Sequence, residues 1–334
     1  MQPNKPPTIY DVARHAGVSI TTVSRLINTP DKVNSNTRVR IQAAIDELGF
    51  VPKAEARARA LHGTGRIGVI SPFFTAPSFV QRLRGIAEAI SAKKFELVIY
   101  TVDSGERLRS LLSSVPLAGN LDGLIILSLP VDDADAHRLV SHGLPTVLVE
   151  FPHPSLSSVE IDDVMGGRMA AQYLLKKGHR RIAFLGDTDL PEYSIHPVSL
   201  RLVGFRQSLR EAGIELPDEF VRLAPYSQAQ TRQVAAELLS LPQPPTAIFV
   251  ATDFQALGVL KAARQLKIQV PEQLAIIGFD DLDLAEYADL TTIHQHLDES
   301  GRLAVEILLS QIESPSRPTR HVKLPLTLIE RQTA

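Results

Sequence analysis

The sequence predicts a small all-α N-terminal head joined to an α/β body made of two doubly wound parallel-sheet lobes. Three observations support this fold class. The first 50 residues contain three short helical patterns separated by glycines and capping residues. From Arg66 onward, apolar runs of strand length alternate with helical patterns, as in parallel sheets covered on both faces. At 334 residues, the chain is too long for one ordinary core.

Capping signals set the bounds of the first two helices in the head. Thr8, followed three residues later by Asp11, forms a capping-box pattern that starts the first helix. Gly17 ends that helix and permits a positive φ in the turn. Ser19 then caps a second helix, predicted over residues 20–28.

The third helix of the head is predicted over residues 35–48. Its inward face carries Ile41, Ala44, Ile45 and Leu48. Gly49 ends the helix. Three short helices can therefore share one small apolar core.

The second helix has two faces of different chemistry. At about 100° per residue, one sector holds the aliphatic side chains Val23, Leu26 and Ile27. The opposite sector holds Thr21, Ser24, Arg25 and Asn28. Short side chains let a helix approach base edges, and an arginine can hold guanine O6 and N7 together. The pair of helices joined at a glycine therefore predicts a helix-turn-helix, whereas a solvated surface helix would carry long Glu and Lys side chains.

Charge is unevenly distributed along the chain. Residues 1–62 contain nine Lys and Arg against five Asp and Glu, although the whole chain has a net charge of −2. A basic head on an acidic body indicates that the head meets a polyanion. Chance clustering is the alternative on charge alone.

Composition restricts the classes of protein to consider. The chain has no cysteine, which excludes disulfides and cysteine-ligated metal. Its apolar runs are shorter than the roughly 18 residues that a membrane span needs, and its N-terminus lacks the apolar region of a signal peptide. We therefore expect a cytoplasmic protein.

The head resembles a known family. The segment "TIYDVARHAGVSITTVSRLIN", followed by "TRVRIQAAIDELGFVPK", is similar to the DNA-binding head of the lactose-repressor (LacI/GalR-type) family of bacterial transcriptional regulators. The resemblance implies three base-reading residues: Ile20, Thr21 and Arg25. It also implies contacts to the DNA backbone from Tyr10, Ser19, Thr22, Ser24, Asn28 and Thr37. Domain bounds of 1–51 for the head and 52–65 for a connector follow.

The connector contains "PKAEARARALHG", which is rich in alanine and arginine. In the family this segment is a hinge helix that enters the minor groove, which implies contacts from Lys53, Ala56, Arg57 and Arg59. Arg59 occupies the position of the family's leucine wedge, and Lys53 replaces the usual asparagine. An arginine can read a narrow minor groove but does not unstack bases as an apolar side chain does. A flexible charged linker is the alternative.

The body alternates predicted strands with predicted helices. The strand candidates are "RIGVIS", "ELVIYT", "DGLIILS", "PTVLVE", "RIAFLG", "TAIFVA" and "LAIIGFD". The helices include Val80–Lys93, Val164–Lys177, Leu200–Ala212 and Phe254–Leu266. In such sheets a ligand binds beyond the carboxyl ends of the strands.

The body is similar to the sensor of the same family, which itself resembles periplasmic sugar-binding proteins. The segments "GGRMAAQYLLKKGHRRIAFLG", "RLVGFRQSLREAGI" and "IIGFDDLDLAEYADLTTIHQ" carry this similarity. It implies a periplasmic-binding-protein-like sensor with an N-lobe at 66–161 and 292–320. The C-lobe would then span 162–291 and 321–334.

The same resemblance places an effector site between strand-end loops. Vicinal hydroxyls of a sugar need planar, bidentate partners, and Arg201 and Asp280 match the family's arginine and aspartate. A surface salt bridge is the alternative for Arg201, and a helix cap or loop brace is the alternative for Asp280. Thr252 stands where many sugar-binding members have asparagine, and Asp253 is expected to cap the following helix.

Four further residues match effector-site positions of the first lobe. Glu150 and Ser128 end predicted strands. Phe73 and Phe74 follow the first strand, where the family often has aromatic side chains. Burial in the core is the alternative for at least one of these two phenylalanines.

Patterns for catalysis are missing from the sequence. It contains no G-x-S-x-G, no H-E-x-x-H and no P-loop, and "HQH" at His294 to His296 is a weak metal pattern. "GTGRIG" fits the dinucleotide fingerprint but precedes a strand, so the order is inverted. We expect neither an enzyme nor a cofactor nor a bound metal.

These features together predict a ligand-responsive repressor of a carbohydrate-utilisation operon. It would bind a near-palindromic operator as a homodimer, since no heptad tail follows Glu330. A small sugar-like effector would alter operator affinity. The alternatives are a nucleoside- or purine-like corepressor, or a phosphoprotein partner, in place of the sugar. A change at Arg201 should abolish the response to a small molecule and matter little to a protein partner.

Overall fold

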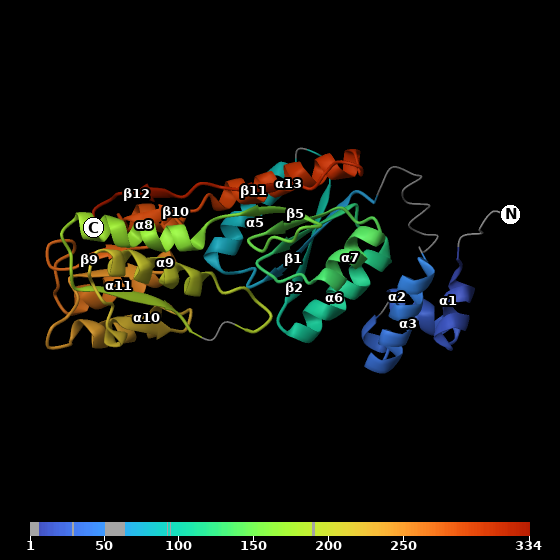
Figure 1. Ribbon diagram of the computed structural model, residues 1–334, viewed down its shortest axis with the longest axis horizontal. Coiled ribbons are helices and arrows are strands. Elements are labelled where there is room, and N and C mark those ends of the chain that lie inside the picture. Colours follow the sequence, from blue (N-terminus) through green and yellow to red (C-terminus); the bar gives the residue numbers. More distant parts are fainter. Residues whose placement is uncertain (1–6, 29, 51–63, 92, 94, 189–190) are drawn as a thin grey trace. The chain divides into compact units, whose positions relative to one another are not determined.

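The computed structural model describes residues 7–28, 30–50, 64–91, 93, 95–188 and 191–334 (Figure 1). Of Asn28 and Asp31 it describes the backbone alone. Contacts divide the chain into two compact units. The first comprises residues up to 74, 84–159 and 301–322, and the second comprises 75–83, 160–300 and 323–334.

The N-terminal head is helical, as the sequence predicts. Its elements are α1 (Ile9–Ala16), α2 (Ile20–Asn28), the 3-10 turn η1 (Pro30–Lys32) and α3 (Ser35–Leu48). The capping box is confirmed, because the Thr8 N–H donates to the Asp11 carboxylate at 2.9 Å. Ser19 Oγ accepts the Thr22 N–H at 3.1 Å. Gly17 has a φ of 61°, which a glycine adopts without strain.

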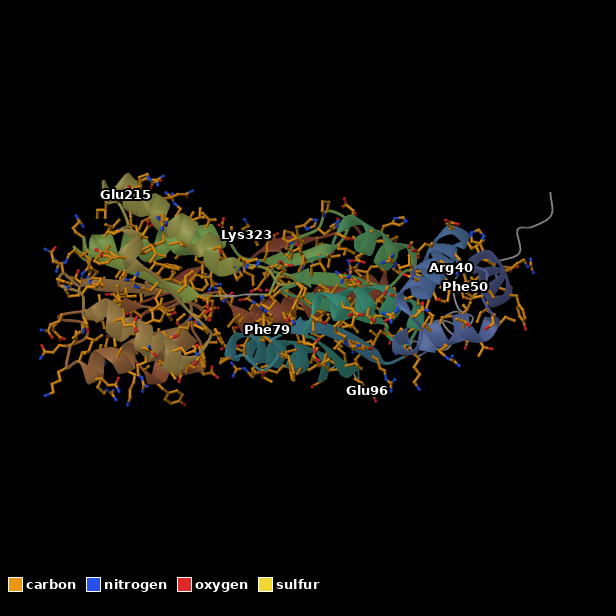
Figure 2. The ribbon with its side chains drawn as sticks, turned by 90° about the horizontal axis from the view of Figure 1, so that it is seen from below. Arg40, Phe50, Phe79, Glu96, Glu215 and Lys323 are labelled. Atoms are coloured by element: carbon orange, nitrogen blue, oxygen red, sulfur yellow. The ribbon has the colours of Figure 1, made fainter. Side chains whose placement is uncertain are left out.

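The head helices share a small apolar core. Val12, Val23, Ile41 and Ile45 are fully buried in it, and Phe50 is 4% exposed. A guanidinium links the third helix to the turn between the first two: Arg40 donates to the carbonyl oxygens of Ala16 at 2.6 Å and Gly17 at 3.2 Å. These are carbonyls at the end of α1 that have no partner within the helix. Figure 2 labels Arg40 and Phe50 among the head helices.

The first lobe is built on a six-stranded sheet in the order β11-β5-β4-β3-β1-β2. Parallel pairing joins β1 to β2 and β3, β3 to β4, and β4 to β5. Its strands are β1 (Arg66–Pro72), β2 (Glu96–Val102), β3 (Gly123–Leu127), β4 (Thr146–Val149), β5 (Ser157–Glu160) and β11 (His321–Lys323).

Helices cover both faces of this sheet, which is the doubly wound arrangement. Figure 1 shows α6 and α7 on one face and α5 and α13 on the other. Their bounds are α5 (Pro77–Ser91), α6 (Gly105–Ala118), α7 (Asp133–Ser141) and α13 (Leu297–Glu313). The inner strands β3 and β4 are buried along their whole length, which explains why they read as continuous apolar runs.

The second lobe has a four-stranded parallel sheet in the order β7-β6-β8-β9. A separate antiparallel pair joins β10 to β12. The strands are β6 (Ile182–Asp187), β7 (Val221–Ala224), β8 (Ala247–Val250), β9 (Ala275–Ile277), β10 (Thr292–His294) and β12 (Thr327–Ile329). The helical elements are α8 (Asp163–Lys176), α9 (Pro197–Glu211), η2 (Asp218–Phe220), α10 (Gln228–Leu239), α11 (Asp253–Gln265) and α12 (Asp283–Tyr287).

Aromatic rings fill the centre of the second lobe. Phe249 packs with its ring centroid 5.5 Å from that of Phe184, 5.3 Å from that of Phe205 and 6.5 Å from that of Phe279. All four rings are fully buried. The four rings fix one another by close packing, and they therefore hold the adjoining strands of the second lobe in place.

Helix starts differ from the sequence expectation by one to three residues. The observed helices begin at Pro77, Asp163, Pro197 and Asp253. Proline is favoured in the first helical turn because its missing N–H has no partner there, and Asp162 and Thr252 supply caps for the other two. Residues 292–300, expected in the first lobe, fall in the second unit, where β10 pairs with β12.

The structure also bears on membrane insertion. Among the described residues, the helices are all too short or too polar to cross a bilayer.

Candidate functional site

The outward face of α2 carries the predicted base-reading residues. Thr21 and Arg25 are exposed, and Ile20 is 40% exposed. On the opposite side of the same helix, Val23 is fully buried and Leu26 is 3% exposed. The helix therefore presents a surface of short polar side chains and one guanidinium, as base contact requires.

The predicted backbone-contact residues surround this face. Tyr10 is 62% exposed and Ser19 is exposed, whereas Thr22, Ser24 and Thr37 are half-buried. The hydroxyls of Ser19 and Thr22 lie 2.7 Å apart. The Thr37 N–H donates to the Asn34 side chain at 2.9 Å, which starts α3. The side chain of Asn28, and the connector residues Lys53, Ala56, Arg57 and Arg59, lie outside the described residues.

A second candidate site is centred on Arg201, in the second unit. Its side chain is buried, and its Nε donates to the Asp163 carboxylate at 2.8 Å. Its Nη1 donates to the Ala251 carbonyl at 2.6 Å and lies 3.9 Å from Asp280 Oδ1. The guanidinium stacks over Phe279, with Cζ 3.6 Å from the ring centroid. The surface salt bridge considered above is therefore wrong, because the group is buried in a network.

Close helix packing sets the position of Arg201. A Cβ atom at Gly204 would lie 1.8 Å from the Val164 carbonyl oxygen, and one at Gly167 would lie 1.9 Å from the Arg201 carbonyl oxygen. Only glycine allows α8 and α9 to meet backbone to backbone in this way. This contact brings Asp163, at the start of α8, beside the guanidinium on α9.

Asp280 and Asp253 lie at the strand ends of the same lobe. Asp280 is 2% exposed and accepts the Gln295 amide at 2.5 Å. Asp253 is fully buried and accepts the Leu282 N–H at 2.9 Å and the Thr292 hydroxyl at 2.6 Å. Burial, followed by the charge of Asp280, raises the pKa of Asp253 well above its usual value.

One expectation about this region is wrong. Asp253 does not cap α11; Thr252 is the cap, and its Oγ1 accepts the Gln255 N–H at 3.3 Å. Asp253 is instead the first residue of the helix and turns toward β10. The side chain of Thr252 is thus engaged with its own helix.

Two aromatic residues and two polar residues were predicted for the first lobe. Ser128 and Glu150 directly follow β3 and β4, and the Ser128 hydroxyl donates to the Glu150 carboxylate. Phe73 is 38% exposed and Phe74 is 40% exposed. Burial in the core, the alternative for one of these rings, is therefore wrong for both.

Comparisons with known proteins extend this picture. Residues 8–53 match the lacI family of bacterial regulatory proteins, and residues 171–334 match a periplasmic binding protein-like domain. The ribose operon repressor of Escherichia coli (strain K12) is 33% identical over 333 residues, 98% of this chain and 99% of that protein. The chain belongs to the lacI family. It is a DNA-binding transcriptional regulator.

Solved structures agree with this lacI-family assignment. The complex of the transcriptional regulator CelR with cellobiose has a TM-score of 0.70 and 30% identity, covering 98% of this chain and 100% of that one. The lac repressor dimer bound to operator and the anti-inducer ONPF has a TM-score of 0.69 and 30% identity, covering 98% and 99%. These relatives are regulators, not enzymes.

Sequence reasoning missed two residues of the second candidate site in this lacI-family protein. Asp187 ends β6, and Tyr226 follows β7. The signal for Asp187 was its place directly after "RIAFLG". Tyr226 follows "VRLA", which is too short and too mixed to read as a strand, so its place at the sheet edge could not be seen.

Proposed function

We propose that the protein is a repressor of a carbohydrate-utilisation operon that binds a near-palindromic operator as a homodimer. The outward face of α2 supports this most directly: Thr21 and Arg25 are exposed while Val23 is fully buried. In the related lac repressor structure, a dimer is bound to operator. Two copies of the head would read adjacent half-sites in the major groove. Such a protein works in the cytoplasm, where the operator is.

The connector completes the DNA-binding half of the proposal. Residues 52–65 join a head of residues 1–51 to the lobes, and they would enter the minor groove between the two half-sites. Arg57 and Arg59 would read the groove by its negative potential. Neither side chain would unstack the central base step.

A sugar-like effector would bind at Arg201 and Asp280. The buried guanidinium and the carboxylate 3.9 Å away offer the planar partners that vicinal hydroxyls need. A relative was solved with cellobiose and another is named for the ribose operon. The effector would change operator affinity by the difference in its affinity for the two conformational states of the dimer.

Selection from a random duplex library tests the DNA-binding half. The full chain should enrich a near-palindrome of two half-sites, and binding should weaken on the order of 10³-fold between 50 and 200 mM salt. Fluorescence anisotropy of labelled duplexes measures both effects. Failure to enrich any duplex at low ionic strength would overturn this half of the proposal.

Thermal unfolding in a panel of sugars tests the effector half. A ligand that binds the native state alone raises the unfolding temperature. Arg201→Lys keeps the charge but loses the planar fork, so it should remove the shift. Arg206→Lys, at a partly exposed arginine on the same helix, is the matched control and should keep it. A shift that survives Arg201→Lys counts against the site.

A further inference from the structure

Three polar groups at the carboxyl end of the second lobe's sheet are not used by the network around Arg201. They are the Asp187 carboxylate, the Thr188 hydroxyl and the Tyr226 hydroxyl. Among the residues that the structure describes, Asp187 Oδ1, Thr188 Oγ1 and the Tyr226 hydroxyl oxygen are buried atoms without a hydrogen-bond partner. Buried polar atoms are normally paired, so three such atoms at the ends of two neighbouring strands call for an explanation.

The positions of these groups are fixed by the fold. Asp187 on β6 lies opposite Ala224 on β7, and the Gln255 amide donates to the Ala224 carbonyl at 3.1 Å. The Tyr226 ring stacks on Phe254 at a centroid distance of 4.7 Å and an angle of 22°. The backbone at Asp187 and the ring of Tyr226 are therefore held in place before any ligand arrives. Asp187 as a whole is only half-buried, so part of the residue is open to solvent although its Oδ1 is not.

The charges around these groups are mostly negative. Three carboxyl groups, those of Asp163, Asp187 and Asp280, interact with one guanidinium, that of Arg201. Arg201 already donates to Asp163 and to the Ala251 carbonyl. An anionic ligand would find few free donors and several negative charges here.

The pKa values of Asp187 and Tyr226 are both raised, mainly by burial. Burial raises the pKa of Asp187 to about 6, and the Arg201 charge offsets this only in part. Burial, followed by the charges of Asp280, Asp187 and Asp253, raises the pKa of Tyr226. The tyrosine hydroxyl thus stays neutral and can both donate and accept.

We propose that Asp187, together with the Tyr226 hydroxyl, contacts the effector and restricts it to an uncharged or cationic polyhydroxy compound. The inference rests on the proposed effector function of the Arg201 site. A ligand hydroxyl or ammonium supplies the donor that the Asp187 carboxylate lacks, so binding removes the cost of an unpaired acceptor. Sugar phosphates and sugar acids supply negative charge instead, and they are rejected.

Matched ligands that differ in charge provide the test. Calorimetric titration of the full chain at pH 7.5 would compare ribose with ribose 5-phosphate, and glucose and glucosamine with glucose 6-phosphate and gluconate. At least one neutral or amino sugar should bind, and its phosphate or acid should bind about 100-fold more weakly or not at all. A phosphate or acid that binds more tightly than its neutral parent overturns the inference and leaves the effector function standing.

Substitutions at Asp187 test the residue itself. Asp187→Ala should weaken the bound neutral sugar about 10-fold or more, and Asp187→Asn should weaken a bound amino sugar more than a neutral one. Asp218→Asn, at a fully exposed carboxylate of the same lobe, is the control and should change neither affinity. Unchanged binding in Asp187→Ala overturns the inference. If no sugar of any charge binds the native chain while it still binds a selected duplex, the sugar-effector function itself fails.

Discussion

The Arg201 guanidinium and the Asp163 carboxylate form an ion pair of 2.8 Å in which both side chains are almost completely withdrawn from water, at 4% and 12% exposure. A buried pair of this kind contributes little net stability, but the loss of one partner leaves the other charge unpaired in a medium that solvates it poorly. The pair therefore fixes a geometry more than it strengthens the fold. It also makes Arg201 sensitive to changes in Asp163.

Arg201→Ala should lower the free energy of unfolding by about 3–5 kcal/mol, because Asp163 would keep its charge without its partner. Adding Asp163→Asn should restore part of the lost free energy of unfolding. The double variant should therefore be destabilised by less than the sum of the losses in the two single variants. Chemical denaturation of the three variants gives the coupling energy. Strict additivity would show that the pair does not act as a unit.

Arg25→Ala should relax the choice of operator. The loss of a bidentate contact to guanine costs about 1–3 kcal/mol at one base position and equalises the affinities for the bases there. Thr37→Ala is the contrasting variant, since loss of a backbone contact should weaken all duplexes alike. Competition binding with single-base operator variants separates the two effects. An unchanged preference at every position in Arg25→Ala would mean that another side chain reads the bases.

Gly204→Ala should disrupt the contact between α8 and α9. The new methyl group would lie 1.8 Å from the Val164 carbonyl oxygen, so the helices would have to move apart. We expect a loss of about 3 kcal/mol or more of unfolding free energy, together with weaker effector binding. Val203→Ala, on the exposed side of the same helix, should change stability by only about 0.5 kcal/mol. Similar unfolding midpoints for both variants would contradict the packing argument.

Stability should depend on pH through Asp187. Its pKa is raised in the folded chain to about 6, so folding favours the protonated form. This contribution is fully present below the ordinary pKa of about 4 and is lost as the pH rises through about 6. Asp187→Asn should therefore stabilise the chain at pH 7.5 by at most about 3 kcal/mol, and hardly at all at pH 4. Thermal unfolding across this range tests the trend, and a gain that is the same at both pH values would exclude it.

Effector affinity should follow the same titration. A ligand that donates to the Asp187 carboxylate should bind more weakly as the pH falls below about 6, and Asp187→Asn should remove that dependence. The other charged groups near the site are Arg201, Asp163, Asp253 and Asp280. Only Asp187 combines a buried oxygen without a partner, among the residues described, with a pKa raised to this range.

Local signals in the sequence predicted the head well. The capping residues Thr8 and Ser19 and the turn glycine Gly17 act within a few residues of themselves, so their effects can be read along the chain. The division of α2 into a buried and an exposed face follows from its periodicity. The base-contact and backbone-contact roles of these residues stay predictions.

The second site was harder to predict because it depends on contacts between distant segments. Arg201 and Asp280 came from the family resemblance, and the structure places them 3.9 Å apart. Asp187 and Tyr226 come together through the register of β6 and β7, and the short strand β7 gives no clear apolar pattern. Thr252, and not Asp253, caps α11, because the Asp253 carboxylate accepts the hydroxyl of Thr292. Thr292 lies 39 residues from Asp253 in sequence, so this could not be read locally.

The close backbone contact between α8 and α9 limits which residues can change if this regulator evolves to bind a new effector. Gly167 and Gly204 hold α9, which carries Arg201, directly against α8. A substitution that moved the Arg201 guanidinium would therefore also disturb the packing of the two helices. Asp187 and Tyr226, at the ends of β6 and β7, are not part of this glycine contact. Laboratory evolution toward another effector should therefore accumulate changes at Asp187 and Tyr226 and leave Gly167, Gly204 and Arg201 untouched.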